Sequence, residues 1–218
     1  MTFAVALCGC LTAGACAAST PRAAVPRMSA SGGVLTLPDS ASATGRAVPL
    51  VIGTTNGDLR SFDWRNTELP GQFCEVPGLL SFKDAQALGT SNRWGAVHFY
   101  AANILYGDLG SDEPSVAAVS VGCDNGGGTA DGELAFAAIL LTSAAKQIEV
   151  LGTITPQMNP IGEHATLLSK IQIADGKVVV DEDWYTPSDE TCCPTGRATT
   201  VWTWANGELT AGTPDITN

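Results

Sequence analysis

The sequence predicts a mainly β fold, either a β-sandwich or an α+β fold built on an antiparallel sheet, stapled by disulfides and preceded by a signal segment and a flexible linker. Apolar runs of strand length recur between turn residues from residue 60 onward. The dipeptides Asp175-Gly176 and Asn206-Gly207 each separate two such runs, as tight hairpin turns do. Four cysteines lie in the same region, and an even number is typical of a disulfide framework.

One β-rich domain is expected from residue 60 to residue 213 of a chain with 218 residues, of which 44% are hydrophobic. Single strands are predicted within 94–109, 115–123, 133–143 and 147–155, and hairpins within 167–185 and 198–210. An earlier pair of strands is predicted within 78–89, where "FKDAQAL" fits a helical turn equally. Residues 133–148 also suit a helix by propensity. Residues 214–218 are interpreted as a C-terminal tail.

The charge balance excludes some classes of partner. The chain has 22 acids and 11 bases, a net charge of −11. Residues 98–218 hold 16 of those acids and only 4 of the bases. A field of that sign repels phosphate backbones and anionic headgroups. We therefore expect no nucleic-acid binding, and any contact with a membrane to be hydrophobic or covalent.

The first 16 residues are predicted to be a signal segment. They contain only small, apolar and uncharged polar residues, and the first charged side chain is Arg22. The stretch is too short and too rich in alanine and glycine for a stable membrane span, but it suits the apolar part of a secretory signal. A signal normally begins with basic residues, which are missing here. We therefore expect that the true start lies upstream, an atypical signal being the alternative.

Two cysteines near the start are candidates for lipidation after signal cleavage. Cys16 is preferred because "AGAC" follows a full apolar run and precedes a polar tether, "AASTPRAAVP". Cys10 is the alternative because "LCGC" has leucine three residues before the cysteine. An ordinary signal cleaved before Ala18 is also open. The chain is exported under all three interpretations.

Residues 17–59 are predicted to form a flexible linker. They are rich in alanine, serine, threonine, proline and glycine. Such a composition buries too little apolar surface to offset the entropy of an ordered chain. Two short strand-like pieces, "GVLTL" and "AVPLVIG", are candidates for packing on the edge of the domain.

The four cysteines expected in the exported domain are Cys74, Cys123, Cys192 and Cys193. They allow three pairings. A bond between the adjacent pair would close a small ring that distorts the peptide between them, outside the usual disulfide geometry. We therefore expect each neighbour to pair with a different distant cysteine. A zinc site is disfavoured because adjacent ligands do not readily share one tetrahedral ion, and no Cys-x-x-Cys spacing indicates a redox thiol.

Three stretches carry a family resemblance. "YGDLGSDEPSVAAVSVGCDNGGGTADGELAFAAIL", "KIQIADGKVVVDEDWY" and "DETCCPTGRATTVWTWANGEL" resemble the actinobacterial cell-envelope lipoproteins related to LppP/LprE. The resemblance covers residues 63–209, and its most specific piece is "TCCPTG" with the tryptophan-rich hairpin after it. This chain has "GDLGSDEP" where relatives often have "GDLDGDG". The resemblance implies an exported, often lipid-anchored protein of undefined biochemical role, and it supplies no catalytic residues.

Few residues suggest chemistry. His98 lies in a predicted strand, where a lone histidine is more often structural, while His164 beside Glu163 is a candidate general base. The serines near His164 lie in no nucleophile elbow, and the glycine-rich stretch lacks the end of a phosphate-binding loop. Asp108, Asp112 and Glu113 are weak candidates for a calcium site, because their spacing misses the usual loop pattern.

Four aromatic residues form a possible ligand platform: Trp184, Tyr185, Trp202 and Trp204. Trp202 and Trp204 share one face of a strand, because side chains alternate between faces. That face either packs the core or binds a glycan or peptide, and the core is favoured.

These observations together predict an exported cell-envelope protein, either lipid-anchored or secreted, with a binding or structural role. Its expected partners are the membrane, through an N-terminal lipid, and an envelope protein or glycan. We expect no catalysis and no cofactor. The alternative is a secreted hydrolase that acts on envelope or small-molecule substrates through His164 or an acidic cleft.

Overall fold

A computed structural model describes residues 50–110, 115–127, 130–159 and 164–217. The chain divides into two units, 1–44 and 45–218, and all the described residues belong to the second. The predicted signal segment, both candidate lipidation cysteines and most of the predicted linker lie outside the described residues. Within the described part, no helix is long and apolar enough to cross a membrane.

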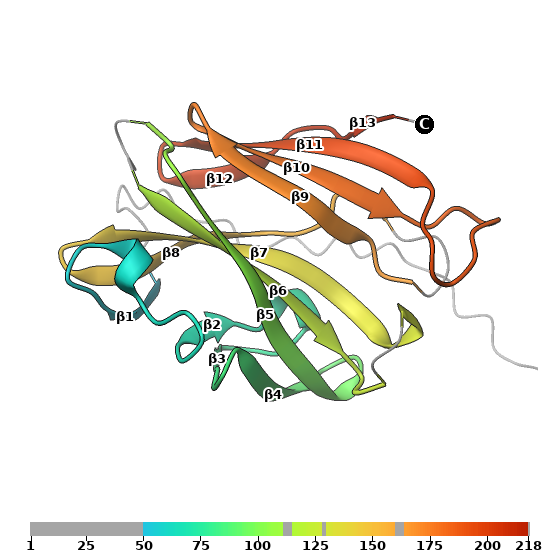
Figure 1. Cartoon of the computed structure of the whole chain (residues 1–218), viewed down its shortest axis with the longest axis horizontal. Helices are drawn as coiled ribbons and strands as arrows, with labels where there is room; N and C mark the ends of the chain where they lie inside the picture. The colour runs from blue at the N-terminus through green and yellow to red at the C-terminus, as the bar shows by residue number, and fades with distance from the viewer. Residues whose placement is uncertain (1–49, 111–114, 128–129, 160–163, 218) are drawn as a thin grey trace, which may run out of the picture. The chain divides into compact units, whose positions relative to one another are not determined.

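The larger sheet has six antiparallel strands in the order β1-β8-β7-β6-β5-β4 (Figure 1). Their bounds are β1 Leu50–Thr54, β4 Gln86–Ser91, β5 Gly95–Gly107, β6 Val116–Asp124, β7 Glu133–Ala144 and β8 Gln147–Ile154. From β4 to β8, each strand pairs with the next one along the chain. This meander confirms the predicted antiparallel, mainly β fold.

The smaller sheet contains the two predicted hairpins. Its order is β12-β11-β10-β9, and β13 also pairs with β11. The bounds are β9 Leu167–Ala174, β10 Lys177–Trp184, β11 Gly196–Ala205, β12 Glu208–Ala211 and β13 Asp215–Ile216. Asp175-Gly176 and Asn206-Gly207 both have positive φ at each residue, which is the conformation that a tight hairpin turn requires. Both turn predictions are confirmed.

A small hairpin and three short helical turns complete the described fold: β2 Glu68–Pro70, β3 Leu79–Ser81, η1 Leu59–Ser61, η2 Gln72–Cys74 and η3 Ala130–Gly132. The predicted strand pair within 78–89 forms two strands, but each pairs elsewhere, β3 with β2 and β4 with β5. Between them, Asp84 and Ala85 have φ of 51° and 68°. They make a tight turn closed by a bridge between Lys83 and Gln86, not a helical turn.

The helix that residues 133–148 allowed by propensity does not form. Residues 137–141 are at most 1% exposed, because β7 lies between β6 and β8 and is covered on both faces. Ile139 and Leu141 face one apolar cluster, while Ala138 and Leu140 face the other. A continuous apolar run of this kind is typical of a strand buried on both sides.

The six-stranded sheet therefore separates two cores. The first core packs β2, β3, η1 and η2 against one face, through Trp64, Leu69 and Phe99 among others. The second core lies between the two sheets and contains Val178 and Trp202. Figure 1 shows the orange and red strands of the smaller sheet on one side of the larger sheet and the β2–β3 hairpin on the other.

The folded region extends beyond both expected boundaries. β1 lies inside the predicted 17–59 linker, where it pairs antiparallel with β8 as an edge strand. This is the "AVPLVIG" piece, a candidate for edge packing. Within the predicted 214–218 tail, Ile216 pairs with Ala198 and Asp215 with Thr199. In both places the sheet supplies hydrogen-bonding partners that composition does not reveal.

The predicted disulfide pairing is wrong. Cys74 pairs with Cys123, and Cys192 pairs with its neighbour Cys193. Cys74, in η2, and Cys123, in β6, both lie in the first core with 0% exposure. The adjacent pair lies in the loop between β10 and β11, and the six-stranded sheet separates the smaller sheet from the first core. Ring geometry alone therefore does not predict the pairing, because the fold keeps the adjacent cysteines away from the first core.

Candidate functional site

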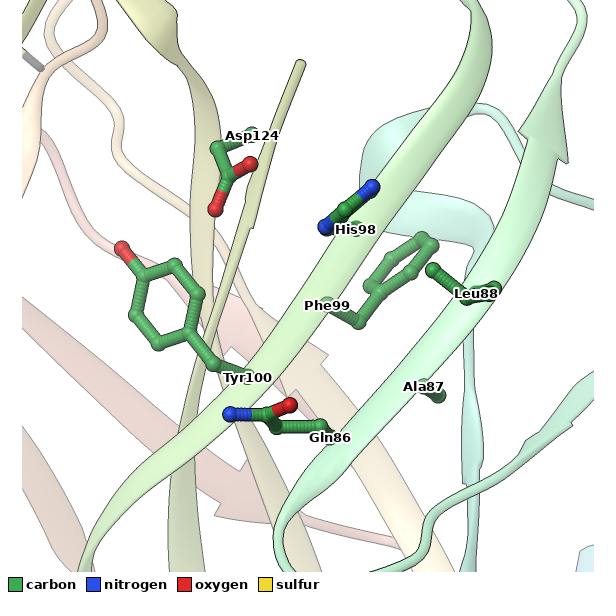
Figure 2. A pocket seen from close by; sticks show the side chains of 7 residues that line it. All are labelled: Gln86, Ala87, Leu88, His98, Phe99, Tyr100 and Asp124. Carbon is green, nitrogen blue, oxygen red and sulfur yellow. The ribbon is translucent and has the colours of Figure 1, made fainter. Parts of the chain in front are cut away.

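An open pocket of about 510 Å³ lies over strands β4, β5 and β6 (Figure 2). Its lining residues are Gln86, Ala87, Leu88, His98, Phe99, Tyr100 and Asp124. Antiparallel register explains most of this set. Leu88 is opposite His98, and His98 is in turn opposite Asp124. Three neighbouring strands therefore bring an apolar, an imidazole and a carboxylate side chain into one row.

Strand alternation decides which of these side chains meet solvent. Ala87 and Phe99 are buried in the first core, so Leu88, His98 and Tyr100 point to the opposite face. Leu88 is 74% exposed, and His98 is exposed as well. Figure 2 shows Asp124 and the Tyr100 hydroxyl on the side of the pocket away from Leu88, with His98 between them.

Tyr100 extends across β6 to reach β7. Its hydroxyl donates a 2.6 Å hydrogen bond to Oε2 of Glu133. The ring passes over Gly122, where an added Cβ would lie 2.4 Å from Cζ of Tyr100. Only glycine leaves room for this crossing. Gly122 therefore positions the phenol, and the phenol in turn hydrogen-bonds the Glu133 carboxylate.

Burial shapes the ionisation of this pair. Burial raises the pKa of the Tyr100 phenol, and the hydrogen bond to Glu133 adds to that rise. Burial also raises the pKa of Glu133; the Tyr100 hydrogen bond opposes that change, and the charge of Asp124 adds to it. Within the described part of the chain, no basic side chain forms an ion pair with Asp124 or Glu133. The two carboxylates thus create an uncompensated negative field beside the pocket.

The start of the loop after β6 packs beside the exposed His98. An added Cβ at Gly126 would lie 3.3 Å from Nε2 of His98, so the backbone there packs against the imidazole. Oδ1 of Asp124 accepts a hydrogen bond from the Gly126 amide, which fixes the start of this loop. The pocket itself therefore offers an acceptor in Asp124, an imidazole, and an apolar wall at Leu88, and the Tyr100 hydroxyl links it to Glu133. It suits a ligand that carries hydroxyl or amine donors next to an apolar part.

His164 lies in a different place, beside Tyr185. The two ring centroids are 4.5 Å apart, and Nδ1 of His164 is 3.4 Å from Oδ1 of Asp131. That distance satisfies an ion pair, but the buried Nδ1 makes no hydrogen bond. Glu163, its expected companion, lies outside the described residues. The structure therefore brings Asp131 and Tyr185 to His164, two neighbours that no sequence pattern indicates.

The four aromatic residues of the possible platform are mostly covered. Trp202 is 7% exposed within the second core, and Tyr185 is 5% exposed. Trp204 is half-buried against the same core. Trp184 is half-buried too, and its indole packs on Gly196, where an added Cβ would lie 2.4 Å from the ring. These contacts leave little aromatic surface for a ligand.

The weak calcium candidates do not come together in the described residues. Oδ1 of Asp108 accepts a 2.6 Å hydrogen bond from the Gly110 amide, a local turn contact. Asp112 and Glu113 lie outside the described residues. Within those residues, no group of three histidine, cysteine or acidic side chains is close enough to hold a metal ion.

The loop between β10 and β11 is organised around one carboxylate. Asp189 accepts hydrogen bonds from the backbone and hydroxyl of Thr186, at 2.7 and 2.9 Å, and from those of Thr195, at 2.9 and 2.7 Å. These bonds hold the pKa of Asp189 below its usual value, and the bond from the Thr195 hydroxyl has the largest effect. The Tyr185 hydroxyl donates to the Thr191 carbonyl at 2.8 Å.

Sequence reasoning missed the pocket because its members are far apart in the chain. The available signal was the alternation of His98 and Tyr100 on one strand, which places both on one face. Nothing in the sequence linked that face to Asp124 or Glu133. No protein-family model, curated protein or solved structure matches the chain.

Proposed function

We propose that the protein is an exported, lipid-anchored component of the cell envelope that binds an envelope glycan or protein and has no catalytic activity of its own. The main support is the state of its cysteines. All four cysteines of the described region form disulfides, and structural disulfides persist in oxidising compartments outside the cytosol. The apolar start with Cys10 and Cys16, and the resemblance of residues 63–209 to LppP/LprE lipoproteins, agree with export.

This support differs from the one that the sequence suggested. A clamp between the adjacent cysteines and two distant strands was expected, and that clamp is absent because the neighbours pair together. The buried Cys74–Cys123 bond takes its place as the disulfide that joins distant parts of the fold. The presence of disulfides, whatever their pattern, therefore supports export.

The pocket over β4, β5 and β6 is the proposed binding surface. Carboxylates accept hydrogen bonds from hydroxyl and amine groups, and Asp124 and Glu133 have no cationic partner within the described residues. Amino sugars carry both kinds of donor on a ring with apolar faces, which fits Leu88 as the opposite wall. An envelope glycan with amino sugars is the ligand class we favour.

The anchor is tested by acyl labelling of the full chain in a bacterial host that processes lipoproteins. We expect label on the wild type, loss of label in Cys16→Ala, and retention in Cys10→Ala. Globomycin should block maturation of the labelled protein. Label lost only in Cys10→Ala would move the anchor to Cys10. An unlabelled wild type would remove lipidation from the proposal.

Binding is tested by titrating the mature protein with glucosamine and chitotriose while recording NMR spectra. We expect shifts at His98 and Leu88, and weaker binding in Asp124→Asn and Tyr100→Phe. Asp215→Asn is the matched control, because Asp215 is exposed on β13 in the other sheet. Equal affinity in all three variants would reject the pocket as the binding surface.

A hydrolase is the second candidate, and one observation favours it. Asp131 lies 3.4 Å from His164, as an acid that orients a general base would. Under this alternative the mature protein hydrolyses nitrophenyl esters or envelope glycans, and His164→Ala loses that activity while His98→Ala keeps it. Absence of turnover in the wild type supports the binding proposal instead.

A further inference from the structure

The two disulfides differ in how a reductant can reach them. Cys74 and Cys123 are fully buried in the first core. Cys192 and Cys193 are both exposed. They belong to the loop between β10 and β11, which lies at one end of the smaller sheet (Figure 1). Thiol–disulfide exchange requires a thiolate to approach a sulfur atom directly. Access therefore favours exchange at the adjacent pair and protects the buried pair.

The two bonds also differ in what they hold together. Cys74 and Cys123 are separated by 49 residues, whereas Cys192 and Cys193 are neighbours. A disulfide lowers the entropy of the unfolded chain by an amount that grows with the logarithm of the number of residues in the loop that it closes. The adjacent bond closes no loop beyond its own ring. Opening it therefore removes no connection between distant parts of the fold.

Other contacts hold the loop in place without this bond. Asp189 joins Thr186 to Thr195 on either side of the cysteines through four hydrogen bonds. Tyr185 holds the carbonyl of Thr191, the residue before Cys192. The Cys193 amide also donates to the Glu190 carbonyl at 3.0 Å. The loop thus has its own framework, which would keep the two sulfurs adjacent in the reduced form.

We propose that Cys192 and Cys193 form a thiol–disulfide exchange site that accepts two electrons from an external dithiol. A thiolate of the dithiol attacks one cysteine sulfur, and the other cysteine leaves as a thiolate and takes up a proton. The second thiol of the reductant, as its thiolate, then attacks the reductant's other sulfur, which is held in the mixed disulfide. This step releases the first cysteine as a thiolate, which takes up a proton. The reductant departs as a disulfide, and the protein carries two adjacent thiols.

The site goes beyond the proposed binding role and does not depend on it. Its substrates are dithiols in one direction and disulfides in the other, because exchange is reversible. The absence of a Cys-x-x-Cys spacing does not exclude this role. Adjacent cysteines already form an intramolecular pair, so the second thiol needed to resolve a mixed disulfide is present.

The test uses the mature, oxidised protein in buffers of increasing dithiothreitol, without denaturant. Samples are quenched with iodoacetamide and mapped by peptide mass spectrometry. We expect complete loss of the Cys192–Cys193 bond at a dithiothreitol concentration that leaves Cys74–Cys123 intact and the circular dichroism spectrum unchanged. The reduced pair should then bind phenylarsine oxide with one-to-one stoichiometry and reform its bond when oxidised dithiothreitol is added.

The matched control is Cys192→Ser with Cys193→Ser, which should keep the fold and bind no phenylarsine oxide. The proposal is overturned if the adjacent bond opens only together with Cys74–Cys123, if it opens only in denaturant, or if the reduced pair fails to reoxidise. A lipidation result, positive or negative, changes none of these outcomes, so failure of this proposal is distinguishable from failure of the proposed function.

Discussion

At the scale of single residues, the pocket depends on one glycine and one part-buried hydrogen bond. Gly122 leaves space for the Tyr100 ring, and the ring carries a hydroxyl to Glu133 on the next strand but one. Each of these residues alone is unremarkable in the sequence. Their effect arises because antiparallel register brings β5, β6 and β7 together at this position.

Replacing Gly122 with alanine should force Tyr100 out of its place. The added Cβ would lie 2.4 Å from the ring, and such overpacking typically costs about 1–3 kcal/mol. We expect a loss of that size in the free energy of unfolding, measured with urea. In the Tyr100→Ala background the same change should cost much less. Equal cost in both backgrounds would show that the ring does not cause the loss.

Glu133 should give a pH dependence of a definite sign. Burial raises the pKa of Glu133 in the folded protein. The Tyr100 hydrogen bond opposes this rise, and the charge of Asp124 adds to it. The folded state therefore holds the Glu133 proton more tightly than the unfolded chain does. The stability that this proton provides is present below the unfolded pKa, and it is lost as pH rises through the folded pKa.

Glu133→Gln removes this titration and keeps an oxygen for the Tyr100 hydroxyl. We expect the variant to gain stability relative to the wild type as pH rises from about 4 to about 7, the range above the ordinary glutamate pKa. Urea unfolding at several pH values measures this difference. Glu208→Gln, at an exposed position of β12, is the control. If the wild type instead gained stability relative to the variant over this pH range, the raised pKa of Glu133 would be contradicted.

At the scale of elements, one buried carboxylate joins the end of the larger sheet to the smaller one. Glu182, on β10, is 0% exposed. It accepts hydrogen bonds from the amides of Gln157 and Met158, just after β8, and from the Thr200 hydroxyl on β11. These three hydrogen-bond donors satisfy both oxygens of the Glu182 side chain. The loop after β8 is thereby fixed against the centre of the smaller sheet.

Removing this carboxylate should be costly. Glu182→Leu leaves three donors without this partner, and a buried donor left unsatisfied typically costs about 1–3 kcal/mol. Glu182→Gln keeps one acceptor oxygen and should cost less. Thermal unfolding and hydrogen exchange at the Gln157 and Met158 amides measure the two losses. Leucine and glutamine variants as stable as the wild type would show that the network does not hold the loop.

At the scale of the whole molecule, the six-stranded sheet is a central layer with a core on each face. Cys74–Cys123 stabilises the first core, because it ties η2 to β6. Cys192–Cys193 lies at an end of the smaller sheet and joins only its own two residues. The two bonds therefore contribute very differently to the stability of the fold.

Removing each disulfide in turn measures this difference. For the loop between Cys74 and Cys123, the chain-entropy model gives a contribution of about 4 kcal/mol. We expect Cys74→Ala with Cys123→Ala to lose a free energy of unfolding of that order. Cys192→Ser with Cys193→Ser should lose almost none. If the second pair of substitutions proved the more costly, the ring would be a structural element and the framework around Asp189 insufficient.

The sequence by itself determined the central strands of both sheets, the two glycine turns and the mainly β class, because alternation and turn chemistry act over a few neighbouring residues. It also narrowed the helix-or-strand choice at residues 133–148 without resolving it. Tertiary structure resolved it by covering β7 on both faces.

Only the tertiary structure decided the disulfide pairing, the strands formed by residues 50–54 and 215–216, and the pocket around Tyr100. Each depends on contacts between residues far apart in the chain. Cys74 meets Cys123, and not a cysteine of the loop after β10, because the central sheet places the first two on the same face. Local propensity contains no information about which face of a sheet a distant segment will cover, and that packing choice fixed the bonds and the site.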